Sequence, residues 1–212
     1  GTKKKRIVYS YGEEDNIIFK FIAFNLYEFD DEFSRNCYAF RRGYGVRDAV
    51  KRFRGNRDFS RMYCFKADIS NYFNSIDIEI LLDRLAFVKE KDSGLYQLFD
   101  KILREERVYE KGQVIKESHG AMAGTPCSPF FANVYLSDVD RYFEGMRVPY
   151  FRYSDDVLIF ADSEEELRRR KDIFLGEIDK HKLTINEEKV SYSKRGEGFE
   201  FLGLAYENGE IN

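Results

Sequence analysis

Two aspartates stand side by side in the stretch FRYSDDVLIF, where Asp155 and Asp156 interrupt residues that otherwise suit buried β-strands. Adjacent carboxylates repel each other, and removing them from water costs further free energy. A bound cation would offset both costs. The alternative interpretation is a plain turn, because aspartate favours turns.

A third carboxylate, Asp68, closes another apolar run, MYCFKADIS. If the strand that ends at Asp68 pairs with a hairpin that turns at Asp155, the carboxylates meet at one edge of a sheet. Hard carboxylate oxygens with no histidine or thiol nearby favour Mg²⁺ or Mn²⁺. Two such ions can activate a hydroxyl group and stabilise a departing pyrophosphate during in-line phosphoryl transfer.

Other metal chemistry has little support in the sequence. Only two histidines, His119 and His181, are present, and the three cysteines are far apart, so a zinc site has too few ligands. Reduced thiols in a cytoplasmic protein are the simplest interpretation of the cysteines. We find no run of 18 uncharged apolar residues and no signal-peptide pattern, so we expect no membrane partner.

The elements that must position these carboxylates follow from apolar periodicity. The pattern predicts strands at 4–12, 62–70, 149–153, 157–161, 187–193 and 199–206, and a hairpin turning at EKGQ. It predicts helices over 16–29, 49–55, 78–85, 95–104 and 164–181, and one that starts with Ser128 as N-cap and Pro129 in its first turn. From Tyr63 onward the order is β-α-α-β-β-α-β-β. This order resembles a split βαβ sheet with one extra helix, which is an α+β fold.

Positive charge is concentrated in the first third of the chain. The net charge is −3, yet residues 35–66 hold 10 Lys or Arg and only 2 Asp or Glu. Aromatic residues alternate with these cations, which suits a polyanion with stackable bases. On this basis Arg54 and Arg57 are candidate nucleic-acid contacts. The alternative is a solvated helical face.

Six motifs in a fixed order make the interpretation more specific. FKADISNYFNSI resembles motif A of reverse transcriptases, AGTPCSPFFANVYL resembles motif B, and YSDD is similar to the YxDD box of motif C. CYAFRRGYGVRDAV resembles the fingers motif of group II intron enzymes, and LTINEEKVSYS and GFEFLGL resemble motifs D and E. The set spans about residues 35–204. It resembles the bacterial reverse transcriptases, the group that includes group II intron, retron and phage-defence enzymes.

This resemblance implies a fold and a reaction. The fold is a polymerase palm, with a ferredoxin-like antiparallel sheet and helices on one face, plus mostly helical fingers. Fingers are expected at 1–61, with part of 86–122 contributing, and the palm at 62–212, while a thumb is absent from this chain. The reaction is RNA-directed DNA synthesis, with two Mg²⁺ (or Mn²⁺) ions, an RNA template, a DNA or RNA primer and dNTPs.

The resemblance also assigns roles around the metal ions. Asp68 and Asp155 would bind both metals, helped by the Ile69 carbonyl, and Asp156 would be an auxiliary carboxylate. Lys189 falls near the lysine that is proposed to protonate pyrophosphate. Alternatively, Lys189 belongs to an ordinary exposed turn.

Further residues would contact nucleotide and primer. Phe73 falls at the steric gate that excludes a ribose 2′-OH, or else it is a core residue. Arg41, Lys5 and Arg6 would meet the triphosphate, unless they are solvated surface charges. Ala123 and Gly124 would lie against the nucleotide, with Gly124 allowing close backbone approach or only shaping the loop. The strand pair at Phe201, Leu202 and Gly203 would grip the primer or form sheet core.

Two features depart from the family pattern. Met122, Ala123 and Gly124 replace the usual Pro-Gln-Gly of motif B, which removes an amide that contacts the nucleotide. The chain also stops where a thumb would begin, so we expect a fingers–palm fragment whose activity depends on the missing part.

Several alternatives stay open at this stage. A template-independent or protein-primed DNA polymerase of the phage-defence type would keep the same metal site. A catalytically silent nucleic-acid-binding palm domain is the rival from another class. An RNA-binding module would need an aromatic [KR]-G-[FY]-[GA]-F strand, which we do not find. A diguanylate cyclase would need a Gly-Gly acidic turn, and an RNA-dependent RNA polymerase would favour a smaller residue than Phe73.

Overall fold

The computed structural model describes residues 7–53, 59–207 and 210–211, and it divides into two compact units. The first unit combines Gly1–Leu26 with Asn71–Tyr135, and the second combines Tyr27–Ser70 with Leu136–Asn212. The predicted domain boundary between residues 61 and 62 lies inside the second unit. The assignment of fingers and palm therefore stays a prediction.

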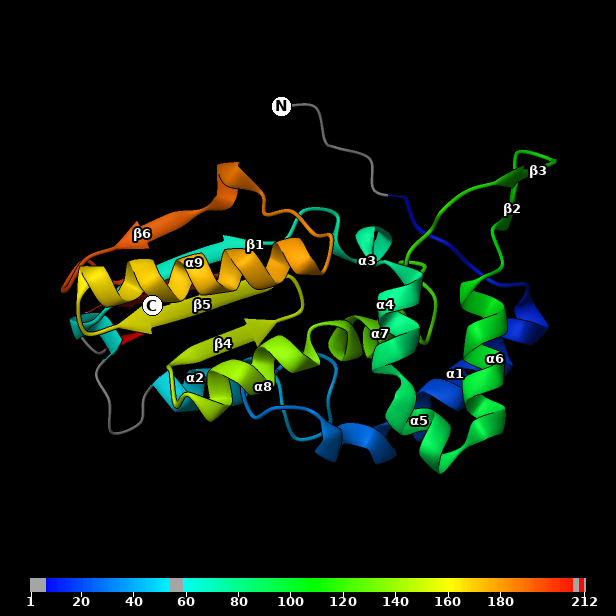
Figure 1. Ribbon diagram of the computed structural model, residues 1–212, viewed down its shortest axis with the longest axis horizontal. Coiled ribbons are helices and arrows are strands. Elements are labelled where there is room, and N and C mark those ends of the chain that lie inside the picture. The colour runs from blue at the N-terminus through cyan, green and yellow to red at the C-terminus, as the bar shows by residue number, and fades with distance from the viewer. Residues whose placement is uncertain (1–6, 54–58, 208–209, 212) are drawn as a thin grey trace. The chain divides into compact units, whose positions relative to one another are not determined.

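A four-stranded antiparallel sheet forms the centre of the second unit (Figure 1). Its strands, in spatial order, are β4 (Tyr150–Tyr153), β5 (Asp156–Ala161), β1 (Tyr63–Asp68) and β6 (Ser191–Ser193). The first strand in sequence thus lies between the third and the fourth, which is the order of a split βαβ sheet. The predicted sheet topology is confirmed.

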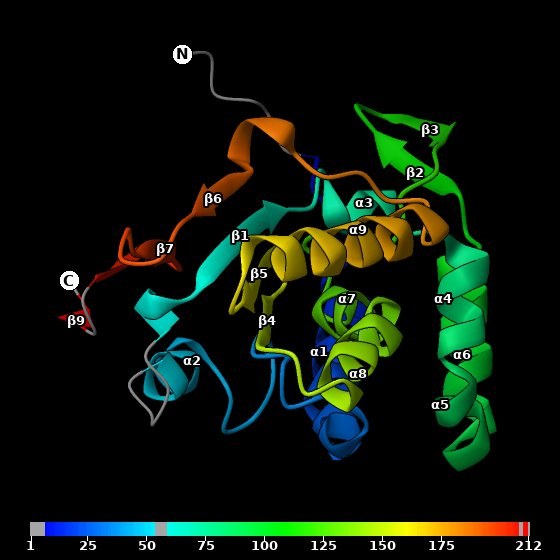
Figure 2. The ribbon, with the colours of Figure 1, turned by 60° about the vertical axis from the view of Figure 1, so that its left-hand side comes forward.

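Helices α8 (Ser137–Gly145) and α9 (Glu164–Lys180) cover one face of this sheet (Figure 2). The Phe143 ring stacks on Tyr150 with centroids 4.7 Å apart, and Phe174 lies against Phe65. Helix α9 begins where the Ser163 side chain accepts a hydrogen bond from the Glu166 N–H. Its buried residues are Leu167, Phe174 and Ile178, which helical spacing places on one side of the helix.

The opposite face is covered by α2 (Val46–Phe53), by the short 3₁₀ turn η2 (Phe59–Arg61) and by the hairpin of β7 (Phe199–Phe201) and β8 (Leu204–Glu207). Phe53 is central to this core: its ring lies 4.5 Å from Phe151 and 4.8 Å from Tyr206, measured between centroids. Strand β9 (Glu210–Ile211) pairs with β8.

Two predicted strands near the C-terminus differ from the structure. The stretch 199–206 is a tight hairpin, because Leu202 and Gly203 both adopt positive φ, at 55° and 76°, and reverse the chain. The stretch 187–193 begins with the 3₁₀ turn η3 (Glu187–Lys189), so strand β6 contains only its last three residues.

The first unit is mostly helical. It contains α1 (Glu13–Asn25), α3 (Tyr72–Ser75), α4 (Ile78–Arg84), α5 (Ala86–Lys91), α6 (Ser93–Leu103), α7 (Ser128–Tyr135) and the hairpin of β2 (Arg107–Glu110) and β3 (Gln113–Lys116). The hairpin turns at Lys111 and Gly112 as predicted. Another 3₁₀ turn, η1 (Leu26–Glu32), follows α1 directly.

Two further predictions are wrong in this unit. Residues 7–12 form no strand; the Tyr9 N–H donates to the Ala123 carbonyl instead. Ser128 lies inside α7 rather than at its N-cap, and its hydroxyl donates to the Thr125 carbonyl at 2.9 Å. Within the described ranges, we find no helix long and apolar enough to span a bilayer.

Candidate active site

Strands β1 and β5 place Asp68 directly opposite Asp156. The two residues are the last matched pair in the β1–β5 register, so their side chains project from the same face of the sheet. Asp68 is buried and Asp156 is half-buried. Two carboxylates are thus held together at one sheet edge. The sequence pattern had paired Asp68 with Asp155, and a contact between those two carboxylates stays a prediction.

The turn between β4 and β5 brings Asp155 to the same edge. Ser154 is buried in a left-handed conformation with φ of 59°, which reverses the chain within two residues. The Ile69 N–H then donates to the Asp155 carbonyl at 3.0 Å. The main chain of Asp155 is therefore tied to the residue that follows Asp68.

A buried ion pair supports this turn from within the sheet. Arg152 and Asp140 have negligible solvent exposure, and two guanidinium nitrogens of Arg152 reach the carboxylate at 2.8 and 2.5 Å. A further nitrogen of Arg152 donates to the Ser154 carbonyl at 3.1 Å, and the Tyr150 hydroxyl also donates to Asp140. The sequence prediction missed this pair, although an arginine within an apolar strand is itself a signal for a buried partner.

Lys189 also reaches this edge of the sheet, which we call the acidic edge because Asp68, Asp155 and Asp156 lie there. Its Nζ lies 2.7 Å from Oδ2 of Asp68. The loop that carries it is fixed by main-chain bonds, because the Asn186 N–H donates to the Asp68 carbonyl at 2.7 Å and the Ser70 N–H donates to the Thr184 carbonyl at 2.8 Å. The hydrogen bond to Asp68 raises the pKa of Lys189, which keeps the ammonium charged at neutral pH.

The electrostatics of Asp156 show that this edge is rich in negative charge. Burial raises the pKa of Asp156, and the charges of Asp155 and Asp68 raise it further, while Lys66 and Lys189 lower it. Lys66 was not predicted as a site residue. It lies two positions before Asp68 in β1, so strand alternation places both side chains on the same face, and this spacing was the available signal.

The donor set at this edge suits a hard divalent cation. It consists of carboxylate and carbonyl oxygens, which Mg²⁺ and Mn²⁺ prefer. Among the residues that the structure describes, no group of three or more His, Cys, Asp or Glu side chains forms a metal cage. Mg²⁺ usually binds through one or two carboxylates together with substrate phosphates, so the residues present fit such an ion.

The predicted nucleotide contacts of the first unit lie around α3. Phe73, in α3, is only partly buried, which differs from an ordinary core phenylalanine. The Ala123 N–H donates to the Asn74 side chain at 3.2 Å. Gly124 has φ of 96°, and a Cβ atom there would lie 3.0 Å from the Tyr9 carbonyl oxygen. Gly124 therefore permits close approach of the chain's own backbone, which agrees with its loop-shaping interpretation.

The Arg41 guanidinium is occupied by hydrogen bonds within the protein. Arg41 is buried, and its guanidinium donates to the carbonyls of Ser34, Cys37 and Asp30 at 2.7 to 2.9 Å. It also lies over the Tyr44 ring at 3.9 Å. A role in triphosphate binding would require Arg41 to leave these carbonyls, and that role stays a prediction.

The remaining predicted residues divide into two groups. Phe201 is fully buried in the core around Phe53, and Leu202 and Gly203 form the tip of the β7–β8 hairpin, so the primer-grip role stays a prediction. The other group lies outside the described residues and consists of Lys5, Arg6, Arg54 and Arg57.

Comparison with known proteins agrees with this fold. Residues 2–206 match the family model described as reverse transcriptase (RNA-dependent DNA polymerase). The chain is 26% identical over 160 residues to the retron Ec83 reverse transcriptase of Escherichia coli; the match covers 70% of this chain and 49% of the relative. The chain thus spans about half the length of this curated relative.

Solved structures support the fold independently. Apo telomerase from Candida tropicalis superposes with a TM-score of 0.68 at 13% identity, over 95% of this chain and 41% of the telomerase chain. Telomerase from Candida albicans, solved in complex with the TWJ fragment of telomeric RNA, gives 0.64 at 12% identity, over 91% and 37%. These likenesses, at identities below 25%, concern the fold alone. The family match makes the assignment specific: the chain belongs to the reverse transcriptase family.

Proposed function

We propose that this chain carries the catalytic centre of an RNA-directed DNA polymerase, which adds dNTPs to a primer 3′-OH along an RNA template. The single observation that carries the proposal is the placement of Asp68 opposite Asp156, with the Asp155 main chain bonded to Ile69. Family membership supports the same reaction.

The residues of the acidic edge would hold two Mg²⁺ (or Mn²⁺) ions. Asp68 and Asp155 would be the principal ligands, with the Ile69 carbonyl and Asp156 in support. When bound, such ions activate the attacking hydroxyl and neutralise charge on the departing pyrophosphate. The negative charges that raise the pKa of Asp156 are the charges that a divalent cation would relieve.

The chain's own side chains contribute binding and protons. Lys189 keeps a charged ammonium at this edge, where it can hold a proton for the leaving pyrophosphate. Phe73 would close the space under the 2′ carbon of the incoming sugar, which would select dNTPs over rNTPs. Lys5, Arg6 and Arg41 would contact the triphosphate, Arg54 and Arg57 the template, and the 201–203 hairpin the primer.

Primer extension tests this proposal. With Mg²⁺, a primed RNA template and dNTPs, a full-length enzyme that contains this chain should extend the primer, and Asp155→Asn in that enzyme should lower the rate by roughly a thousandfold or more, equivalent to several kcal/mol of charge stabilisation. Asp172→Asn, on the exposed side of α9, is the matched control and should act like wild type.

Two further measurements make the result decisive. Circular dichroism should show that Asp155→Asn keeps the fold. Omission of the template should stop extension, because extension without template would favour the template-independent polymerase instead. If Asp155→Asn extended the primer as fast as Asp172→Asn, the proposed metal site would be wrong.

A further inference from the structure

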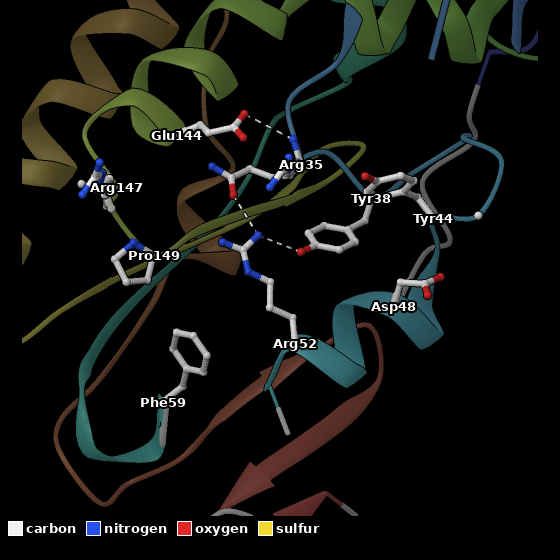
Figure 3. Close-up of a pocket in the computed structure, with 12 residues that line it drawn as sticks. Arg35, Tyr38, Tyr44, Asp48, Arg52, Phe59, Glu144, Arg147 and Pro149 are labelled. Atoms are coloured by element: carbon white, nitrogen blue, oxygen red, sulfur yellow. Dashed lines mark hydrogen bonds between the residues drawn. The ribbon is translucent and has the colours of Figure 1, made fainter. Parts of the chain in front are cut away.

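The second unit contains a cavity of about 770 Å³ that the acidic edge does not use (Figure 3). Its walls come from the loop around residues 35–38, from α2 and the loop before it, and from the segment that follows α8. Val148 and Pro149, which line it, precede strand β4, whereas Ser154 and Asp155 follow that strand. The cavity and the turn at Ser154 and Asp155 therefore adjoin opposite ends of β4.

Arg52 presents a fixed guanidinium to this cavity. One of its nitrogens donates to the Asn36 Oδ1 at 2.9 Å and to the Tyr38 hydroxyl at 2.8 Å, and the group lies 4.6 Å from the centroid of the Phe151 ring. We find no partner for its other two nitrogens within the described ranges. A guanidinium whose orientation is already set loses little entropy when it binds an anion.

Two further cations, Arg35 and Arg147, line the cavity. Arg35 and Arg147 are both exposed, and in the described part of the chain neither side chain forms an ion pair. Glu144 and Asp48 are the acidic lining residues; Glu144 accepts the Arg35 main-chain N–H at 3.3 Å, and Asp48 faces Lys51 at 3.6 Å. Three arginines against two partly engaged carboxylates favour an anionic ligand.

The Asn36 side chain adds a buried hydrogen-bond donor to this site. Arg52 can only donate hydrogen bonds, so the amide oxygen of Asn36 must face it, and the amide nitrogen is left over. That nitrogen is buried and has no acceptor in the part of the chain that the structure describes. Such donors are rare in folded proteins, and one beside a basic cavity indicates a ligand that carries acceptor oxygens.

Aromatic side chains complete the lining. Tyr44 is half-buried, and the guanidinium of Arg41, 3.9 Å from the centre of its ring, keeps the ring in place. A fixed aromatic ring beside arginines is the combination that binds single strands, because bases stack on the ring while cations hold the phosphates. The carboxylates of Asp48 and Glu144 could accept hydrogen bonds from the amino groups of bases.

We propose that this cavity binds a single-stranded segment of nucleic acid, separate from any strand at the acidic edge. Arg35, Arg52 and Arg147 bind its phosphates, and Tyr44 stacks on a base. A strand fits better than an isolated nucleotide, because Arg35 and Arg147 come from different walls of a large cavity and both remain available.

Fluorescence anisotropy with a labelled single-stranded RNA of about twelve nucleotides tests the proposal. The double variant Arg35→Gln/Arg147→Gln should bind at least tenfold more weakly at low salt. It should also reduce the slope of log K against log[salt] by about 1.4, since each phosphate contact on a single strand contributes about 0.7. Tyr44→Leu should weaken binding by roughly tenfold without changing that slope.

Two controls separate this site from others. Arg169→Gln removes an exposed arginine from α9, on the other face of the sheet, and should keep the wild-type affinity and slope. Asp155→Asn should also leave binding at the cavity unchanged, so loss of polymerase activity and loss of this site can be distinguished. Because Arg35 and Arg147 are exposed, their replacement should leave the melting temperature unaltered.

Two results would contradict the proposal of a strand-binding cavity. If the double variant matched Arg169→Gln in affinity and salt dependence, the cavity would not be a nucleic-acid site. If the double variant lost affinity for a nucleoside monophosphate but kept its affinity for the RNA strand, the cavity would be a nucleotide pocket, and the strand proposal would be wrong.

Discussion

The Lys189 ammonium lies 2.7 Å from Oδ2 of Asp68, so the carboxylate expected to bind metal is already paired with a cation of the same chain. The Lys189 side chain remains about half exposed, whereas that of Asp68 is nearly buried. A divalent ion that takes this oxygen would compete with Lys189 for it, and the displaced ammonium would stay close to the acidic edge.

Replacement of Lys189 should separate metal affinity from catalysis. Lys189→Gln should bind Mn²⁺ severalfold more tightly without nucleotide, because no ammonium competes for Asp68. Nucleotide addition should nevertheless slow by roughly 10²-fold, the usual range for a lost proton donor. Titration calorimetry and single-turnover extension measure the two effects, with Lys194→Gln as the exposed control. Unchanged Mn²⁺ affinity would contradict the proposed competition.

The pH dependence of stability should report on Asp156. Because its pKa is raised in the folded state, the folded protein holds a proton that the unfolded chain has lost, so stability falls as pH rises from the usual aspartate range through the raised pKa. Asp156→Asn should remove this dependence and raise the melting temperature at pH 7 relative to wild type. Thermal melts between about pH 4 and pH 7 test this prediction. A stability difference between wild type and Asp156→Asn that stayed constant over the same range would oppose it.

The Arg152–Asp140 pair should matter for both folding and turn geometry. Asp140→Asn or Arg152→Met alone should cost about 3–5 kcal/mol of unfolding free energy, because each leaves a buried charge unpaired. The double variant Arg152→Met/Asp140→Leu should recover much of that stability, since it leaves no charge behind. Denaturant titrations check both expectations.

The same double variant tests the link to the active site. It lacks the guanidinium that donates to the Ser154 carbonyl. Its catalytic rate constant should therefore be lower than that of the wild type, even though its stability recovers, while its KM for dNTP changes little. Recovery of full activity together with stability would show that Arg152 only fills the core.

Sugar selection should depend on Phe73. Phe73→Val should admit ribonucleotides, because discrimination by a clash disappears with the ring. A rejection of about 3–4 kcal/mol corresponds to some hundreds-fold preference at roughly 1.4 kcal/mol per decade. Since Phe73 is only partly buried, the loss of stability should be smaller than the roughly 3–5 kcal/mol of a core phenylalanine. An unchanged ratio of dNTP to rNTP incorporation, with a lower melting temperature, would assign Phe73 to packing.

Replacement by alanine should change the free energy of unfolding in opposite directions at two glycines. Gly124→Ala should destabilise the chain by at least about 1–2 kcal/mol, because φ is positive and the new Cβ would press on the Tyr9 carbonyl. Gly176→Ala, within α9 and with open space around its Cβ position, should stabilise by about 0.5–1 kcal/mol. Chemical denaturation distinguishes the two. A stabilising effect at Gly124 would contradict the described packing against residues 8–9.

Features that depend on local periodicity were predictable from the sequence. Strand β1 and its terminal Asp68 follow from the apolar run, and the turn at Ser154–Asp155 follows from two apolar segments that flank charged residues. Helix α1 was also predictable, but its buried side was not. Phe21 is 70% exposed whereas Phe19 is buried, because apolar residues occupy several sides of this helix.

Features that depend on distant partners were not predictable. Arg41 is an arginine in a basic block, and nothing local reveals that three main-chain carbonyls enclose it. The partner of Arg152 lies on a different element, in α8, so only the folded sheet brings the two together. The family resemblance supplied roles for such residues, but it could not supply the contacts that already occupy them.

The way in which the loop of Lys189 is attached affects how freely its sequence can evolve. The loop is attached to β1 through the N–H of Asn186 and the carbonyl of Thr184, groups that almost every amino acid provides. Side chains at 184–186 can therefore diverge widely among descendants of this chain while the lysine stays in place. Proline at position 186 is the exception, because it would remove the N–H that reaches Asp68.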